Sequence, residues 1–359
     1  MAGYIFQKFF YGLLVMWGVV TAIFFLFNVL PGDPARLMLG QRADKESIEM
    51  INRDLGRDKP ISIQYLMYLN DLSIISIHKT KDQTSFLYLS DEKYTYTKLF
   101  VAGTDKVFVL KFPYLRRSYQ NKEKVWTVIL ERLPETAVLA FASILIASLL
   151  GILIGVFAAL KKNSFFDKSS LVFATIFMSG PSFYIGLIFM VWFGYTLGDF
   201  TGLNPTGSLF EMDLYGGGEQ LMLKNLVLPA LTLGLRPLAI IIQLTRSSML
   251  DILSQDYIRT ATAKGLGFYS VVFKHALKNA LSPVITAISG WFAGLMAGTV
   301  FVEDIFGWQG IGHKLVSSLL SYDLPVVMGC VLVVATIFVI INTTVDIVYG
   351  LLDPRVRIK

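Results

Sequence analysis

Five or six stretches of this sequence are apolar for about 18 residues or more, long enough for each to cross a membrane as a helix. An α-helix rises about 1.5 Å per residue, and the hydrocarbon of a bilayer is roughly 30 Å thick. Only 16% of the 359 residues are charged, whereas soluble domains carry about 25%. We therefore predict an all-α polytopic membrane protein. Its six transmembrane helices are expected at residues 9–30, 136–160, 169–197, 226–244, 283–302 and 325–349.

The first apolar stretch, residues 9–30, is interpreted as a retained signal-anchor helix. It is long for a cleaved signal peptide and lacks a small-residue A-x-A cleavage site. It ends abruptly at Pro31-Gly32-Asp33-Pro34.

Lysines and arginines in the short loops predict the orientation, because cytosolic loops carry an excess of them. The loop after the second predicted helix, the loop 246–279 and the tail 350–359 are basic, so both termini are expected in the cytosol. The two short loops on the opposite side are mainly acidic, which makes the long segment 31–135 extracytoplasmic. The basic residues are Lys161, Lys162, Lys168, Arg246, Arg259, Lys264, Lys274, Lys278, Arg355, Arg357 and Lys359.

The long segment 31–135 is predicted to fold as a small α+β domain. Apolar residues in 47–72 recur at helical spacing, whereas 85–114 carries aromatic and β-branched runs broken by polar turns, as short strands do. Nothing in this segment indicates catalysis.

Several kinds of chemistry have no support in this sequence. It contains no G-x-x-x-x-G-K-[ST] nucleotide loop, a single cysteine, Cys330, and three widely separated histidines. The basic residues are spread over loops, which argues against nucleic acid. We therefore expect no enzyme activity, no catalytic residues, no cofactor and no metal site.

Charged groups inside the predicted spans are confined to Arg236 and Asp346. Ion-coupled carriers generally keep acidic or histidine groups there, so such a carrier is disfavoured. Arg236 either snorkels to the interface or pairs locally, or it lies on a substrate pathway. Asp346 is interpreted as an end-of-helix pairing residue.

The loop that follows the fourth predicted span contains a helix–turn–helix pattern, DYIRTATAKGLG at 256–267 and then residues 270–283. Tyr257, Ala261 and Lys264 share one side of a short helix, and Gly265 permits a sharp turn before the second helix, which includes Leu277. A small helix tip flanked by basic residues suits insertion into a groove on a cytosolic protein.

This loop resembles the EAA coupling motif of ABC importer permeases, in particular the DYIRTARAKGL and HALRNALLP variants of the dipeptide/oligopeptide/nickel permease family. Thr262 is the visible departure from that variant. Against the general motif, the chain keeps Ala261, Gly265 and Leu277. It differs from the general motif at Arg259, Thr260, His275 and Lys278.

Further family-like segments follow in the family's order over nearly the whole chain. Residues 74–113 look like an insertion that family members lack, before LRRSY at 115–119. The matching segments are FNVLPGDPA (27–35), LGRDKP (55–60), ERLPET (131–136), LPALTLG (228–234), TRSSML (245–250), VEDIFGWQGIG (302–312) and LDPR (352–355).

The resemblance implies a membrane permease subunit of a bacterial inner-membrane ABC importer, forming half of a path for di- or oligopeptides. Its implied partners are a second homologous permease, two cytosolic ATPases, an extracytoplasmic substrate-binding protein and the lipid bilayer. Nickel or another small solute is an alternative cargo, and an ion-coupled carrier or membrane-bound enzyme is the alternative class. The residues implied in ATPase coupling are Tyr257, Arg259, Thr260, Ala261, Lys264, Gly265 and Leu277.

Two further regions carry functional hypotheses. The segment 302–312 mixes acidic and aromatic residues with glycines, as in a bent segment bordering an outer mouth; the alternative is a passive turn. Its expected gate residues are Glu303, Asp304, Phe306, Trp308 and Gln309. In the inserted segment, one face is expected to pack inward while the other stays wet and basic, either to dock the binding protein or only to stabilise 31–135.

Overall fold

The structure is a computed structural model that describes residues 2–29, 59–80, 85, 87–91, 93–103, 105–213 and 218–352. The expectations for 31–34, for the helix before residue 59 and for the tail after 352 lie outside these residues. The chain divides into two compact units. The larger comprises Met1–Gly12, Arg132–Lys314 and Val334–Lys359, and the smaller comprises Leu13–Glu131 and Leu315–Val333.

Long apolar helices dominate the described residues. Five are long and apolar enough to cross a membrane: Phe6–Phe27, Val125–Leu160, Lys224–Leu253, Ser270–Ala297 and Leu324–Ile347. They lie in α1 (Ala2–Val29), α5 (Val125–Leu160), α9 (Lys224–Leu253), η3 (Ser270–Leu277) with α11 (Lys278–Gly298), and α14 (Leu324–Leu352).

The helix predicted at 169–197 is not continuous. The structure has α6 (Phe165–Ser179) followed by α7 (Ser182–Phe189) and η2 (Met190–Thr196), with a bend of 108° between the two halves. Gly180 and Pro181 at the break have extended backbones, and proline has no N–H to continue the helical hydrogen bonds. The described chain therefore has five candidate spans, or six if the bent pair counts as one.

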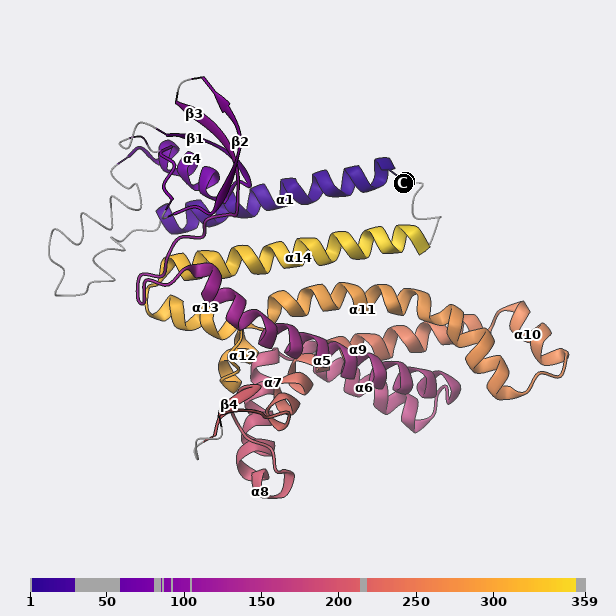
Figure 1. The fold of residues 1–359 in the computed structure, drawn as a ribbon. Coiled ribbons are helices and arrows are strands. Elements are labelled where there is room, and N and C mark those ends of the chain that lie inside the picture. The colour runs from indigo at the N-terminus through magenta and orange to yellow at the C-terminus, as the bar shows by residue number, and fades with distance from the viewer. Residues whose placement is uncertain are drawn as a thin grey trace. The chain divides into compact units, whose positions relative to one another are not determined.

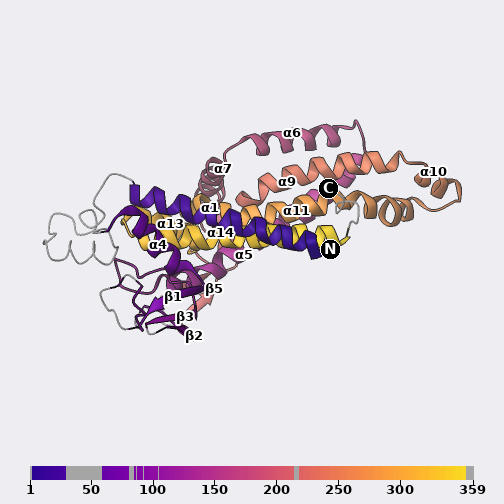
Figure 2. The ribbon, with the colours of Figure 1, turned by 90° about the horizontal axis from the view of Figure 1, so that it is seen from above.

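Helix α9 is the central element of the larger unit. Of its most apolar stretch, 72% is buried, against 22–39% for the other four spans. It packs against α6 and α11, and these three helices run side by side in both views (Figures 1 and 2). Helix α5 approaches α9 at Gly151 and Gly155, where an added Cβ would come within 2.7 Å of Ile241 and 2.6 Å of Thr245. The G-x-x-x-G spacing thus permits close helix packing.

Shorter elements connect the helices of the larger unit. They are α8 (Gly198–Thr201), the hairpin of β4 (Phe210–Met212) and β5 (Glu219–Leu221), α10 (Asp256–Ala263), α12 (Val300–Phe306) and α13 (Ile311–Leu320), the last continuing into the smaller unit.

The smaller unit contains an antiparallel sheet in the order β1 (Ile75–Lys79), β3 (Lys106–Lys111), β2 (Tyr96–Ala102), together with α4 (Ile61–Leu72). Strands β2 and β3 lie where the sequence predicted strands, whereas β1 was not expected. The inner side of the sheet buries Val107 and Val109.

A buried polar cluster lies on this inner side. The Tyr94 hydroxyl donates a hydrogen bond to Asp71 Oδ1 at 2.6 Å, and Lys111 Nζ lies 3.9 Å from the centre of the Tyr94 ring. Burial lowers the pKa of Lys111 to about 8, although Asp71 opposes this shift. Lys111 is only 3% exposed, so this lysine does not lie on the wet, basic face that the sequence predicts.

Candidate functional site

The loop after α9 folds as the predicted helix–turn–helix. Helix α10 ends at Ala263, and Gly265 then adopts a left-handed backbone with φ of 80°. The N–H groups of Gly265 and Leu266 donate to the carbonyls of Thr262 (3.0 Å) and Ala261 (3.3 Å), closing the helix end. The chain then re-enters helical structure at η3, a π-helix that leads into α11.

One side of α10 is fixed to the chain's own core. Ile258 and Ala261 are 5% and 8% exposed. They pack with residues of α5, α9, η3 and α11, and Leu277 is half-buried against the same cluster. Ala261 therefore faces inward, so it is not available to enter a groove on a partner protein. The buried members are Val156, Ala159, Met249, Ile258, Ala261, Val271, Val272, Ala276 and Ala280.

The other side of the loop is exposed and combines basic with aromatic groups. Arg259, Thr260 and Lys264 are exposed, and Arg259 makes only a peripheral ion pair with Asp256 at 3.6 Å. Tyr257 is also exposed, and its hydroxyl accepts a hydrogen bond from Asn279 Nδ2 at 2.9 Å. This bond joins α10 to the first turn of α11.

Three aromatic residues that the sequence reasoning did not assign to the site extend this surface. Phe268, Tyr269 and Phe273 are 61%, 76% and 50% exposed, and the rings of Tyr269 and Phe273 are stacked 6.4 Å apart. Exposed aromatic side chains beside an arginine are typical of protein interfaces. The aromatic residues are visible in the sequence as the run FYSVVF at 268–273, but the spacing of these residues does not show which of them face outward.

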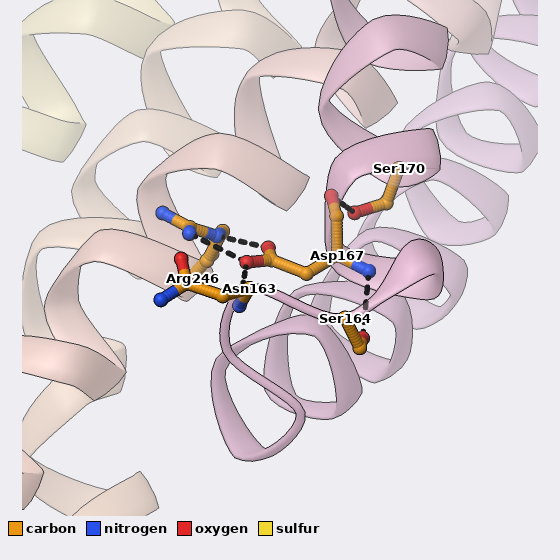
Figure 3. Close-up of polar contacts among 5 residues, drawn as sticks. All are labelled: Asn163, Ser164, Asp167, Ser170 and Arg246. Carbon is orange, nitrogen blue, oxygen red and sulfur yellow. Dashed lines mark hydrogen bonds and ion pairs between the residues drawn. The ribbon is translucent and has the colours of Figure 1, made fainter.

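An ion pair at the base of α9 connects the site to α6. Arg246 donates two hydrogen bonds to the Asp167 carboxylate: Nε donates to Oδ1, and Nη2 donates to Oδ2 at 2.8 Å (Figure 3). The Asn163 N–H also donates to Asp167 Oδ2, at 2.8 Å, and Ser164 caps the helix by accepting from the Asp167 N–H. Asp167 is 1% exposed, and its carboxylate accepts hydrogen bonds from both Arg246 and Asn163. A bidentate arginine–carboxylate pair fixes both distance and angle between α6 and α9.

The five expected gate residues divide into two groups. Glu303, Phe306 and Trp308 are at most 1% exposed, whereas Asp304 is exposed and Gln309 is half-buried. Helix α12 ends at Phe306 and is capped by Gly307, whose φ is 65°. Trp308 Nε1 donates to the Glu135 carbonyl at 3.0 Å. The bend predicted from the glycines is therefore present as a turn between α12 and α13.

Glu303 joins this turn to neighbouring elements. Its Oε2 accepts from the Gly312 N–H at 2.6 Å and the His313 N–H at 3.2 Å, at the start of α13. Its Oε1 accepts from the Thr136 hydroxyl at 2.8 Å, which itself accepts from the Ile311 N–H. Burial raises the pKa of Glu303 despite these donors. An added Cβ at Gly310 or Gly312 would lie closer than 3.0 Å to the Glu303 carboxylate, which explains both glycines.

Arg236 is an exposed residue between buried neighbours, Leu235 and Pro237, in the middle of α9. Within the described residues it makes no hydrogen bond or ion pair. Ile240, Gln243 and Ser247 follow it on the same side of the helix at spacings of three and four.

These features define a multi-pass helical membrane protein with an exposed basic and aromatic surface on α10 and η3. The chain belongs to the family described as binding-protein-dependent transport system inner membrane component. The model of that family matches residues 151–358, and its N-terminal model matches residues 1–87.

Curated relatives cover almost the whole chain. A protein named di/tripeptide transport system permease protein DppB from Pseudomonas aeruginosa is 36% identical over 363 residues, covering 96% of each chain. Proteins named dipeptide transport system permease protein DppB from Alkalihalophilus pseudofirmus and Escherichia coli are each 33% identical, covering 96% and 95% of this chain and of their own. Among solved structures, an amino acid ABC transporter with histidines aligns at 16% identity and a TM-score of 0.42, covering 64% of this chain and 94% of that one.

Proposed function

We propose that this chain is a membrane permease subunit of a bacterial ABC importer and forms half of the path for di- or oligopeptides. The observation that carries the proposal is the exposed aromatic and basic surface of α10 and η3, in a chain similar over 96% of its length to a di/tripeptide permease. A second homologous permease, two cytosolic ATPases and an extracytoplasmic binding protein complete the importer. The chain lies in the bacterial inner membrane and crosses it six times, with both termini and 246–279 in the cytosol and 31–135 outside.

In this proposal the loop 246–279, the coupling loop, transmits movement from the ATPases to the transmembrane helices. The ATPases close on nucleotide and push the exposed side of α10. The buried side of α10 shares one core with α5, α9 and η3, so the displacement moves helices and not only the loop. The clamp between Arg246 and Asp167 carries the same movement to α6.

Two proposed roles concern the path itself. Arg236, which points out of this chain's own core, lines the path or snorkels to the interface. Asp304 and Gln309, the accessible members of the segment 302–312, border the outer mouth, whereas Glu303, Phe306 and Trp308 hold the turn in place.

Cysteine labelling tests the gate. The sequence has one cysteine, Cys330, which is fully buried, so background labelling should be low. In the assembled importer, Gln309→Cys should react with an impermeant thiol reagent at a rate that changes between the nucleotide-free and ATP-bound states. Equal labelling rates in both states would contradict a gate and would mean that the segment 302–312 is a passive turn.

The decisive experiment for the coupling site uses two glycines of one loop. Gly265→Val places a β-branched residue at φ of 80°, which costs on the order of 1 kcal/mol or more and redirects α10. Gly267→Val adds the same side chain into open space without a left-handed backbone and is the matched control. In proteoliposomes with the partner subunits, Gly265→Val should lose substrate-stimulated ATPase activity and uptake of a labelled dipeptide, while Gly267→Val keeps both.

Two results would contradict the proposal. Normal uptake and ATPase stimulation in Gly265→Val, with normal insertion, would remove the coupling role. Uptake of labelled nickel in place of dipeptide by the unaltered importer would contradict a peptide substrate, although the chain would still be an importer permease.

A further inference from the structure

The outward face of the three-stranded sheet is apolar and uncovered. The register places Ile75 opposite Leu110 and Ile77 opposite Phe108, while the Phe100 ring stacks on Phe108 at 4.3 Å. Ile75, Phe100 and Phe112 are 60%, 56% and 60% exposed. We call these residues, with Ile77, Phe108 and Leu110, the apolar sheet face. A contiguous apolar surface of this kind marks contact with a protein or a membrane.

Helix α4 fixes the depth of this region relative to the first span. The Tyr65 hydroxyl and Thr21 Oγ1 are hydrogen-bonded at 2.6 Å, and the Phe24 ring lies 5.1 Å from Tyr65 and 5.7 Å from Tyr68. Thr21 is six residues before Phe27, the end of the apolar stretch, or about 9 Å along the helix. Figures 1 and 2 show α4 beside the Val29 end of α1. If the apolar stretch Phe6–Phe27 spans the hydrocarbon, α4 lies at the depth of the headgroups and outermost acyl chains.

The sheet is attached to α4 and to the start of a second span. The Tyr114 N–H donates to the Asp71 carbonyl in α4 at 2.8 Å, and the Lys111 N–H donates to the Ile74 carbonyl at 2.9 Å. The Phe112 ring lies 4.9 Å from Trp126, whose Nε1 donates to the Pro113 carbonyl at 2.7 Å. Trp126 is in the first turn of α5, and tryptophan is enriched where spans meet the membrane surface. The apolar sheet face is thus continuous with the ends of two spans.

We propose that the apolar sheet face rests on the lipid bilayer, at the boundary between headgroups and acyl chains, in the leaflet at the Phe27 end of α1. That leaflet is the outer one under the topology of the proposed function, but the contact itself requires only that the chain spans a membrane. Lys79 and Lys106, paired in register at the far end of β1 and β3, then meet lipid phosphates.

Lipid fits this face better than a soluble binding protein does. A partner that binds and leaves exposes its docking surface to water between cycles, and such surfaces are only about as apolar as the rest of a protein. A bilayer covers the face permanently and stabilises it through burial of apolar area. A membrane contact therefore accounts for this face of residues 74–113 better than docking of the binding protein does.

Spin labels can locate the face in the assembled importer. In a Cys330→Ala background, a nitroxide is attached at Ile77→Cys or Leu110→Cys on the apolar sheet face. The matched control is Lys98→Cys, an exposed position on the same sheet whose partner in register, Val109, lies on the opposite face. In vesicles of phosphatidylethanolamine and phosphatidylglycerol, collision rates with oxygen and with a water-soluble nickel chelate are compared.

The proposal expects the oxygen-to-nickel collision ratio at Ile77 and Leu110 to exceed that at Lys98 severalfold, because oxygen concentrates in lipid and the chelate stays in water. Ratios equal to that at Lys98 would mean that the face is in water and would overturn the proposal. Exclusion of both reagents would mean that a protein covers the face and would also overturn it. Neither outcome depends on transport, so this test can fail while the proposed function stands.

Discussion

At the scale of single residues, His78 shows how burial sets a protonation state. It is fully buried in β1, 4.9 Å from the Tyr94 ring. Its Nδ1 lies 3.2 Å from the Leu87 carbonyl, which can only accept, so Nδ1 carries the proton and Nε2 accepts from the Ser76 hydroxyl at 3.0 Å. Burial, followed by the nearby Lys111 ammonium, lowers the pKa of His78 to about 4.

A dependence of stability on pH follows. Because the folded pKa lies below the ordinary value of 6.5, the stabilising contribution is complete above pH 6.5 and is lost as the pH falls through about 4. The loss reaches about 3 kcal/mol at full protonation. Hydrogen exchange in β1 and β3, corrected for the intrinsic rate, should therefore accelerate from about pH 7 to about pH 5.

The matched variant is His78→Gln, whose amide can donate to Leu87 and accept from Ser76 without titrating. It should remove most of this acceleration while leaving exchange near pH 7 close to that of the unaltered chain. An equal acceleration in His78→Gln would assign the effect to other groups. The sequence could not supply this prediction, since a histidine with one polar neighbour gives no sign of whether it is buried.

At the scale of elements, apolar runs gave the positions of the spans but not their ends. Helix α5 begins at Val125, eleven residues before the predicted start at Thr136. The prediction started late because the charged residues Glu131, Arg132 and Glu135 interrupt the apolar run. Hydropathy reports which residues sit in hydrocarbon, whereas a helix continues wherever its backbone hydrogen bonds are satisfied. The turn at Gly265 was predictable because a left-handed backbone favours glycine. The break at Gly180–Pro181 carries its own turn signal, Ser179-Gly180-Pro181-Ser182, but a long hydropathy run averages over these four residues.

The crossing of α5 and α9 yields a prediction for helix packing. At Gly155 even a methyl group would come within 2.9 Å of the Ile242 carbonyl, a backbone atom that can move only with its helix. Gly155→Leu should therefore separate α5 from α9 and reduce the free energy of unfolding by about 1–3 kcal/mol, as overpacking typically does. The thermal unfolding temperature of the purified permease in detergent should fall accordingly. Gly18→Leu, where nothing lies within 4 Å, is the control and should unfold as the unaltered chain does. Equal unfolding temperatures for the two variants would contradict close packing at this crossing.

At the scale of the whole molecule, two ion pairs support the proposed topology. Lys8 near the start of α1 pairs with Asp346 near the end of α14 at 2.6 Å, so these two helix ends lie together, as the proposed topology requires. Asp167 lies in the first turn of α6, and its partner Arg246 lies near the end of α9. If α9 crosses the membrane once, as proposed, the segment from α6 to α8 must carry the chain to the side from which α9 starts.

The bent pair is therefore expected to act as one broken span. Helix α6 has 15 residues and is about 22 Å long, too short to cross roughly 30 Å alone, so α7 and η2 must complete the passage. In a Cys330→Ala background, Phe200→Cys, at a position that is 90% exposed, should react with an impermeant maleimide added to intact spheroplasts. Lys161→Cys before α6 and Lys264→Cys after α9 should react only after permeabilisation. If the pair instead turned back as a re-entrant loop, Phe200→Cys and Lys161→Cys would label from one side and Lys264→Cys from the other. That pattern would place the termini on opposite sides and put the basic loop 246–279 outside the cytosol.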